Sequence, residues 1–75
     1  MVRFKLPKYT KYVCGNTVQP TYKDYYTTVK NKPTDSNTKI WRTAIKNLRF
    51  QLFKATGVWW QYIDIDPSDL EFEVI

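Results

Sequence analysis

This 75-residue chain has one cysteine and no histidine, so it lacks both cross-links on which very small domains often depend. An internal disulfide needs two cysteines, and one cysteine without histidine cannot supply the four ligands of a structural zinc ion. The fold must therefore be stabilised by packing or by association with another chain. Aromatic residues make up 17% of the sequence, and we expect them to form much of the core.

The same composition restricts catalysis. Serine occurs only at Ser36 and Ser68, both in expected turns, and a nucleophilic serine would have no histidine as its base. Asp64, Asp66 and Asp69 lie close together in the sequence, as Mg²⁺ or Ca²⁺ ligands can, but turns also favour aspartate and serine. We expect a protein that is not an enzyme and has no metal, no cofactor and no small-molecule substrate.

Charge is unevenly distributed along the chain. All 12 lysines and arginines lie in residues 1–54, whereas five of the seven acidic residues lie in residues 55–75. This asymmetry favours a nucleic-acid partner for the basic part, ion pairing within the fold, or both. No segment has the apolar length of a signal peptide or of a spanning helix, so we expect no membrane association and a cytoplasmic or virion location.

Apolar periodicity predicts a single small basic α+β domain over residues 1–75. Residues 37–56 are expected to form a helix, and Gly57 follows where a left-handed residue would end it. Seven apolar residues share one arc of this helix: Ile40, Trp41, Ala44, Ile45, Leu48, Leu52 and Ala55. The preceding loop, residues 32–37, contains several residues that favour helix N-caps. Alternation or β-branched and aromatic content predicts strands over residues 2–6, 12–14, 22–29, 58–65 and 70–74.

The expected architecture is a small, mainly antiparallel sheet packed on a single helix. Residues 66–69 have turn composition, so the last two strands are expected to form a C-terminal hairpin. Residues 2–6 alternate apolar and basic side chains, and residues 70–74 alternate apolar and acidic ones. Paired in one sheet, these two ends could place opposite charges against each other on one face. The alternative is that each end borders a different strand.

The expected helix carries a basic stripe opposite its apolar arc, formed by Lys39, Arg42, Lys46 and Arg49. Phe50 and Phe53 fall within the same polar arc, where a purely solvated face would have little reason to carry them. In the functional interpretation, the cations contact phosphate groups, and the rings stack on bases or fill a pocket of a partner. In the alternative, the helix ends early or packs on two sides, and both rings belong to the core.

Residues 8–30 interleave lysines with tyrosines. Grooves that combine positive charge with aromatic rings are a common way to hold single-stranded nucleic acid. The residues of this segment predicted to contact nucleic acid are Lys8, Lys11, Lys23, Tyr25 and Lys30. The alternative is that lysine and tyrosine occur together here as they do on ordinary solvated strands.

Trp59 and Trp60 are adjacent in an expected strand, so their side chains should point to opposite faces of the sheet. One can pack on the helix, whereas the other needs cover from another layer of the chain or from another molecule. Tryptophan is a frequent anchor at interfaces. We therefore expect at least one of four interface rings to be buried only against a partner, these rings being Phe50, Phe53, Trp59 and Trp60. Internal packing of all four is the alternative.

Two classes of function follow, and we favour the first. The first is a small non-catalytic nucleic-acid-binding protein, for DNA or RNA, that uses the basic helix face and the Lys/Tyr segment. The second is a structural or assembly subunit, for example of a phage particle, that contacts a protein partner or its own copies. Salt distinguishes them, because phosphate contacts weaken steeply as salt rises whereas an apolar interface hardly responds.

Overall fold

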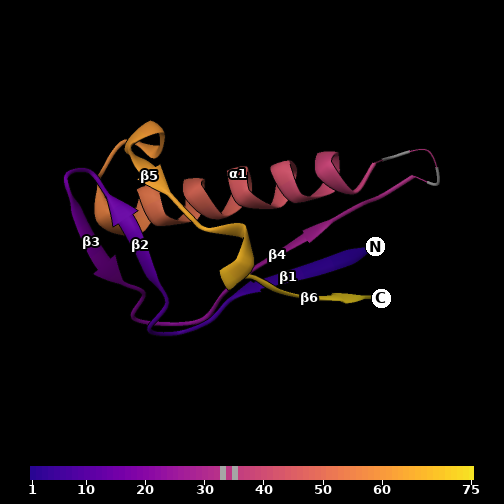
Figure 1. The fold of residues 1–75 in the computed structure, drawn as a ribbon, viewed down its shortest axis with the longest axis horizontal. Helices are drawn as coiled ribbons and strands as arrows, with labels where there is room; N and C mark the ends of the chain where they lie inside the picture. Colours follow the sequence, from indigo (N-terminus) through magenta and orange to yellow (C-terminus); the bar gives the residue numbers. More distant parts are fainter. Residues whose placement is uncertain (33, 35) are drawn as a thin grey trace.

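A computed structural model describes residues 1–32, 34 and 36–75 (Figure 1). Within these residues the chain forms two antiparallel sheets and one long helix, which confirms the predicted α+β class. Sheet A has the strand order β4-β1-β6, with β1 at Val2–Leu6, β4 at Tyr25–Val29 and β6 at Glu71–Val74. Sheet B has the order β3-β2-β5, with β2 at Lys11–Cys14, β3 at Thr17–Pro20 and β5 at Ile63–Asp64.

The helix α1 spans Asn37–Thr56, as its apolar periodicity predicted. Its first turn is capped by Ser36, whose Oγ accepts the N–H of Lys39 at 3.2 Å. Gly57 ends the helix in the left-handed region with φ 78°, and its N–H donates to the carbonyl of Phe53 at 2.8 Å. Pro33 and Asp35, in the expected loop before the helix, lie outside the described residues.

The core lies between α1 and the inner faces of both sheets (Figure 1). Phe4 and Leu6 of β1 are completely buried, and the Phe4 ring meets the Trp41 ring edge-on, with centroids 4.9 Å apart. Ile40, Ala44, Leu48 and Leu52 form the buried stripe of α1. Tyr12, Cys14 and Ile63 contribute side chains of sheet B to the same apolar cluster.

The two ends of the chain pair in sheet A, as their alternation predicted. β1 is the central strand and runs antiparallel to β6, with Arg3 opposite Glu73 and Lys5 opposite Glu71. Arg3 and Glu73 form an ion pair. Phe72 and Val74 occupy the apolar face but remain 59% and 76% exposed, because α1 lies mainly over β4 at the opposite edge of the sheet.

The expected strand over residues 58–65 is wrong in most of its length. A short 3₁₀ helix, η1 (Trp60–Tyr62), follows the end of α1, and β5 contains only two residues. Arg49 explains the difference. Its guanidinium donates to the carbonyls of Trp60 at 3.2 Å and Gln61 at 3.4 Å, whereas in a strand these carbonyls would need donors from a neighbouring strand. Trp59 and Trp60 are thus outside a strand, and their ring centroids lie 6.3 Å apart.

The expected turn at residues 66–69 is present as a second 3₁₀ helix, η2 (Pro67–Asp69). The Asp66 carboxylate accepts the N–H of Ser68 at 3.0 Å, which fixes the start of the turn. β5 and β6 on either side of η2 form a hairpin-like arrangement, although β5 pairs with β2 and β6 pairs with β1. The C-terminal segment therefore joins the two sheets.

Candidate nucleic-acid interface

The chain crosses between the two sheets through two adjacent segments, residues 7–10 from β1 to β2 and residues 21–24 from β3 to β4 (Figure 1). The Tyr9 N–H donates to the Thr21 carbonyl, and the Thr21 N–H donates to the Thr10 carbonyl, both at 2.9 Å. Five residues of these segments are exposed, and we name four of them the crossover platform: Lys8, Tyr9, Tyr22 and Lys23. The fifth, Asp24, is bound to the first segment.

Thr21 fixes the two crossover segments to each other. It is 1% exposed, and its hydroxyl donates to the Pro7 carbonyl at 2.7 Å and accepts the Thr10 N–H at 3.1 Å. Asp24 adds a second link, because its carboxylate accepts the Lys8 N–H at 2.7 Å and lies 3.8 Å from the Lys5 ammonium. Side-chain and backbone hydrogen bonds together hold the backbone of the two crossover segments in a defined arrangement.

Tyr9 has a backbone conformation, with φ 69°, that residues other than glycine rarely adopt. This left-handed conformation costs roughly 1–2 kcal/mol for an ordinary residue, so the hydrogen bond of Tyr9 to Thr21 must help to hold it. The Tyr9 ring is 68% exposed, and the Lys8 ammonium lies 4.9 Å from its centroid. Tyr22 is 75% exposed on the neighbouring segment.

The structure brings together only part of the predicted Lys/Tyr set. Lys8 and Lys23 lie on the platform, and Lys11 is exposed at the start of β2, directly after the first crossover segment. Tyr25 is not available to stack on a base, because it is 9% exposed and its ring belongs to the core. Lys30 follows β4 at the end of the strand remote from the platform.

Tyr9 and Tyr22, rather than Tyr25, are the tyrosines that the platform exposes. The inward direction of Tyr25 follows from the register of sheet A, in which Tyr25 lies opposite the buried Leu6. The sequence signal that could have found this is the position of Tyr25 on the same period-two face as the buried Val29.

The basic stripe of α1 lies on the face of the helix opposite its buried residues. Lys39, Arg42 and Lys46 are exposed there. Arg49 is half-buried and engaged within the chain, since its guanidinium bonds the carbonyls of η1 and lies 5.2 Å from the Trp60 ring centroid. The crossover segments lie on the side of the fold away from α1 (Figure 1), so the stripe and the platform are separate surfaces.

The four predicted interface rings form one aromatic cluster at the C-terminal end of α1. The centroids of Phe50 and Trp60 lie 5.2 Å apart, and those of Phe53 and Trp59 lie 5.1 Å apart. Phe53 also packs against the core, whereas Trp59 remains 48% exposed. Burial of one ring against another molecule stays a prediction, and Trp59 is the ring to which it now applies.

Of the acidic residues in the segment 64–69, Asp66 stabilises the turn. The Asp66 carboxylate accepts the N–H of Ser68 and also its hydroxyl at 2.8 Å, and these hydrogen bonds lower the pKa of Asp66. Within the described residues, no three acidic or cysteine side chains come close enough together to hold a metal ion.

None of the helices in the described ranges has the length and apolar character needed to cross a membrane.

No family model matches this chain, and no match is found among the curated proteins or the solved structures.

Proposed function

We propose that this protein binds single-stranded nucleic acid through the crossover platform, without catalysing a reaction on it. The observation that carries the proposal is the exposure of Tyr9 and Tyr22, 68% and 75%, beside Lys8 and Lys23 on a backbone fixed by Thr21. Tyrosine rings offer flat faces on which bases stack, and each stacked base contributes about 1–3 kcal/mol. The lysine ammonium groups attract the phosphates that join those bases.

Preorganisation of the platform supports this proposal. A ring on a flexible loop loses conformational freedom when a base stacks on it, which weakens binding. The backbone on which Tyr9 is mounted is already paired with that of Thr21, so less ordering is needed. Tyr9 also keeps a strained φ of 69° although burial of its side chain, which is 68% exposed, does not offset the strain.

The exposed basic stripe of α1 has a secondary role in this proposal. Arg42 and Lys46 are exposed on a face without a tyrosine, so they attract phosphate groups but provide no stacking surface. They would increase the rate of encounter and the salt dependence of binding. Arg49 is assigned a structural role instead, because it holds η1 against the helix.

The test is the binding of a labelled oligothymidylate, measured by fluorescence anisotropy over a range of salt concentrations. Tyr9→Asn with Tyr22→Ser removes both rings, and asparagine tolerates the left-handed backbone at position 9. We expect affinity to fall about 30-fold or more with the salt dependence retained. The matched control is Tyr62→Ser, which removes a tyrosine 65% exposed on η1, and its affinity should be unchanged.

A second double variant, Arg42→Gln with Lys46→Gln, separates charge from stacking. It should weaken binding modestly and flatten the salt dependence, because the variant neutralises fewer phosphates and so releases fewer counterions on binding. Absence of binding by the wild-type protein at low salt would show that the proposal is wrong. Equal affinity of the wild-type and the Tyr9/Tyr22 variant would show that the platform is not the site.

A second candidate function is that of an assembly subunit, and the half-exposed Trp59 favours it. Trp59 extends the aromatic cluster to the surface, where a partner could bury its exposed half. Light scattering after size-exclusion chromatography tests this: self-association that persists at high salt and is lost in Trp59→Ser would support it. A monomer in which Trp59→Ser has no effect on any interaction would argue against it.

A further inference from the structure

The two edges of sheet A differ in how they are protected. The edge formed by β4 is covered by the helix, because the Gln51 amide donates to the Tyr26 carbonyl at 2.8 Å and the Asn47 amide donates to the Thr27 hydroxyl at 3.2 Å. Over the described ranges, no hydrogen bond from another element reaches the outer edge of β6. Open edges of this kind can pair with a further strand.

The direction of the β6 backbone groups follows from the pairing of the chain ends. The Met1 nitrogen donates to the Ile75 carbonyl at 3.0 Å, and the Ile75 N–H donates to the Met1 carbonyl at 2.8 Å. Antiparallel pairs alternate between hydrogen-bonded and non-hydrogen-bonded, so Glu73 and Glu71 also bond to β1. The N–H and carbonyl groups of Phe72 and Val74 therefore point outward, along the open edge.

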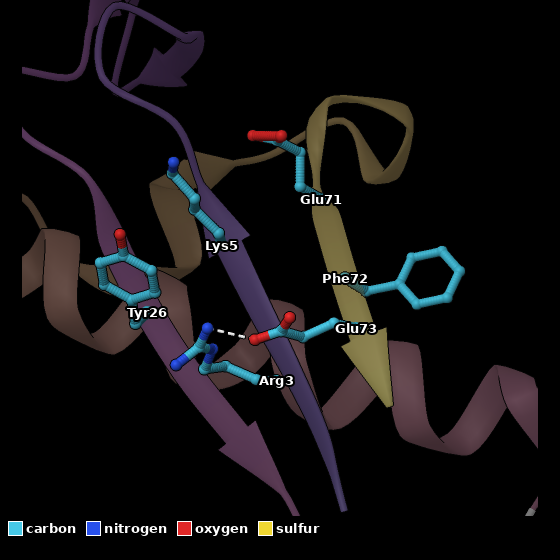
Figure 2. A pocket seen from close by; sticks show the side chains of 6 residues that line it. All are labelled: Arg3, Lys5, Tyr26, Glu71, Phe72 and Glu73. Carbon is cyan, nitrogen blue, oxygen red and sulfur yellow. Dashed lines mark ion pairs between the residues drawn. The ribbon is translucent and has the colours of Figure 1, made fainter. Parts of the chain in front are cut away.

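The side chains of β6 divide by chemistry between the two faces of the sheet. Phe72 and Val74 are mostly exposed on the apolar face, where the Phe72 ring lies 5.4 Å from the Trp41 ring. Glu71 and Glu73 lie on the opposite face, which lines a hollow on the outside of sheet A (Figure 2). Figure 2 shows Phe72 pointing away from the charged side chains that line this hollow.

The two glutamates differ in their partners. Glu73 forms an ion pair with Arg3, whereas Lys5, which lies opposite Glu71, has its ammonium 3.8 Å from Asp24 instead. No ion pair to Glu71 occurs within the part of the chain that the structure describes. The open edge thus combines unpaired backbone groups, an exposed apolar face and a carboxylate without an opposite charge bound to it.

We propose that the open edge of β6 binds an extended segment of a partner protein in which apolar and basic residues alternate, adding a fourth strand to sheet A. Its apolar side chains lie beside Phe72 and Val74, and its basic side chains lie beside Glu71 and Glu73. β1 has this same alternation and already pairs with the other edge of β6. Main-chain hydrogen bonds supply affinity in such strand addition, and alternate side chains supply specificity.

Charge argues against a second copy of this chain as the occupant. If β6 paired with β6 of another copy centred on Phe72, each Glu71 would lie opposite a Glu73. If the pairing were centred on Glu73, the two copies of that glutamate would face each other. Like charges directly opposite each other across strands are destabilising, so these registers oppose self-association.

The test uses the full chain and a labelled peptide of the sequence of residues 1–7, which has the proposed alternation. The control peptide carries Arg3→Glu and Lys5→Glu. We expect saturable binding of the basic peptide and about tenfold or more weaker binding of the acidic one, measured by anisotropy. The protein variant Tyr9→Asn with Tyr22→Ser should bind the basic peptide as the wild type does, since the platform lies outside this site.

Two protein variants examine the edge itself. Val74→Pro deletes a single N–H, which points outward, and proline is tolerated in edge strands, so the fold should be retained while peptide affinity falls about tenfold or more. Glu71→Gln should lower the affinity for the basic peptide about two- to fivefold. Circular dichroism checks that both variants are folded.

Three results would overturn the proposal. The first is equal binding, or no binding, of the two peptides. The second is undiminished peptide affinity in folded Val74→Pro and Glu71→Gln. The third is a wild-type dimer by light scattering that Val74→Pro converts to a monomer, which would identify a second copy as the occupant.

Discussion

Sheet A and sheet B have the same number of strands but are stabilised in different ways. In sheet A, Phe4 and Leu6 of the central strand β1 are fully buried, and the Phe4 ring packs against Trp41 of α1. In sheet B, β5 has two residues and β3 contributes no buried residue, so the sheet is anchored mainly through Tyr12, Cys14 and Ile63. Sheet A therefore contributes more of the core than sheet B does. Sheet B lies where the two crossover segments that carry the platform meet β2 and β3.

Truncation of Phe4 should have the largest effect, because it removes the centre of sheet A. The ring is fully buried between Trp41 and Phe72, with centroids 4.9 and 6.2 Å away. Phe4→Ala should destabilise the fold by about 3–5 kcal/mol. The core of a chain of this length seldom supplies more than about 3–5 kcal/mol, so most molecules of the variant should be unfolded at 25 °C. Urea denaturation followed by circular dichroism measures this.

The matched control for Phe4→Ala is Val18→Ala in sheet B. Val18 is 63% exposed and lies opposite Val13, so its truncation should change the free energy of unfolding by about 0.5 kcal/mol or less. Comparable losses of stability in the two variants would contradict this difference between the sheets.

Thr21→Val tests the junction between the sheets and should have the second largest effect. The change keeps the shape of the side chain but removes the hydroxyl that joins the Pro7 carbonyl and the Thr10 N–H. The Pro7 carbonyl and the Thr10 N–H remain bonded to each other at 3.2 Å, so the cost is the loss of two hydrogen bonds, about 0.5–1.5 kcal/mol each. Thermal unfolding gives the stability, and a lower affinity for oligothymidylate in the folded variant would link the junction to the platform. Unchanged stability would show that Thr21 does not fix the crossover segments.

The pH dependence of stability should separate the anchor of sheet B from the rest of the fold. Burial, together with the neighbouring Cys14, raises the pKa of Tyr12 from 10.0 to about 12. The folded state therefore holds the Tyr12 proton more tightly than the unfolded state does. The resulting stability is present below pH 10 and is lost as the pH rises towards about 12.

Tyr12→Phe provides the measurement for this prediction. Urea denaturation of both proteins between pH 9 and pH 12 should show a shallower loss of stability in the variant, because phenylalanine has no proton to lose. The lysines and the other tyrosines are common to both proteins, so their titration cancels in the comparison. Parallel curves would show that Tyr12 does not titrate differently in the folded state.

Local patterns were sufficient to predict α1 and the pairing of the chain ends. The helix has continuous apolar periodicity and a capping residue at each end, and the two terminal strands have complementary alternation. Residues 58–65 were mispredicted because their aromatic and β-branched composition does not reveal Arg49, which bonds η1 from the preceding helix. That interaction depends on how the chain folds back on α1, which propensity does not encode.

The candidate site also combines features that local patterns predict with features that depend on contacts between distant segments. The sequence located Lys8 and Lys23 within a basic, tyrosine-rich segment, and both are exposed on the platform. Which tyrosines are exposed could not be predicted from that segment alone, because it depends on the strand register that buries Tyr25 and on the Thr21 hydrogen bonds between two separate segments. The local composition predicts which residue types form the site, whereas long-range pairing determines which of those side chains are exposed.

The smallest effect is expected from the charges that face each other across the paired ends. Arg3→Glu with Lys5→Glu would set two introduced carboxylates against Glu71 and Glu73, and would also place one beside Asp24. Each opposed pair contributes roughly 0.2–1 kcal/mol, so the double variant should lose stability more strongly at low salt than at high salt. Thermal unfolding at two ionic strengths measures this.

Adding Glu71→Lys with Glu73→Lys to that double variant should restore part of the stability, since opposite charges again face each other along β1 and β6. Restoration should be incomplete for two reasons. The ion pair of Lys5 with Asp24 is not rebuilt, and neither are the interactions of Arg3 and Lys5 with the Tyr26 ring, at 5.8 and 6.0 Å from its centroid. A quadruple variant no more stable than the double would mean that the opposed charges of β1 and β6 contribute nothing to holding the ends together. Restoration to full wild-type stability would instead assign the whole effect to the β1–β6 pairs, leaving none for Asp24 and Tyr26.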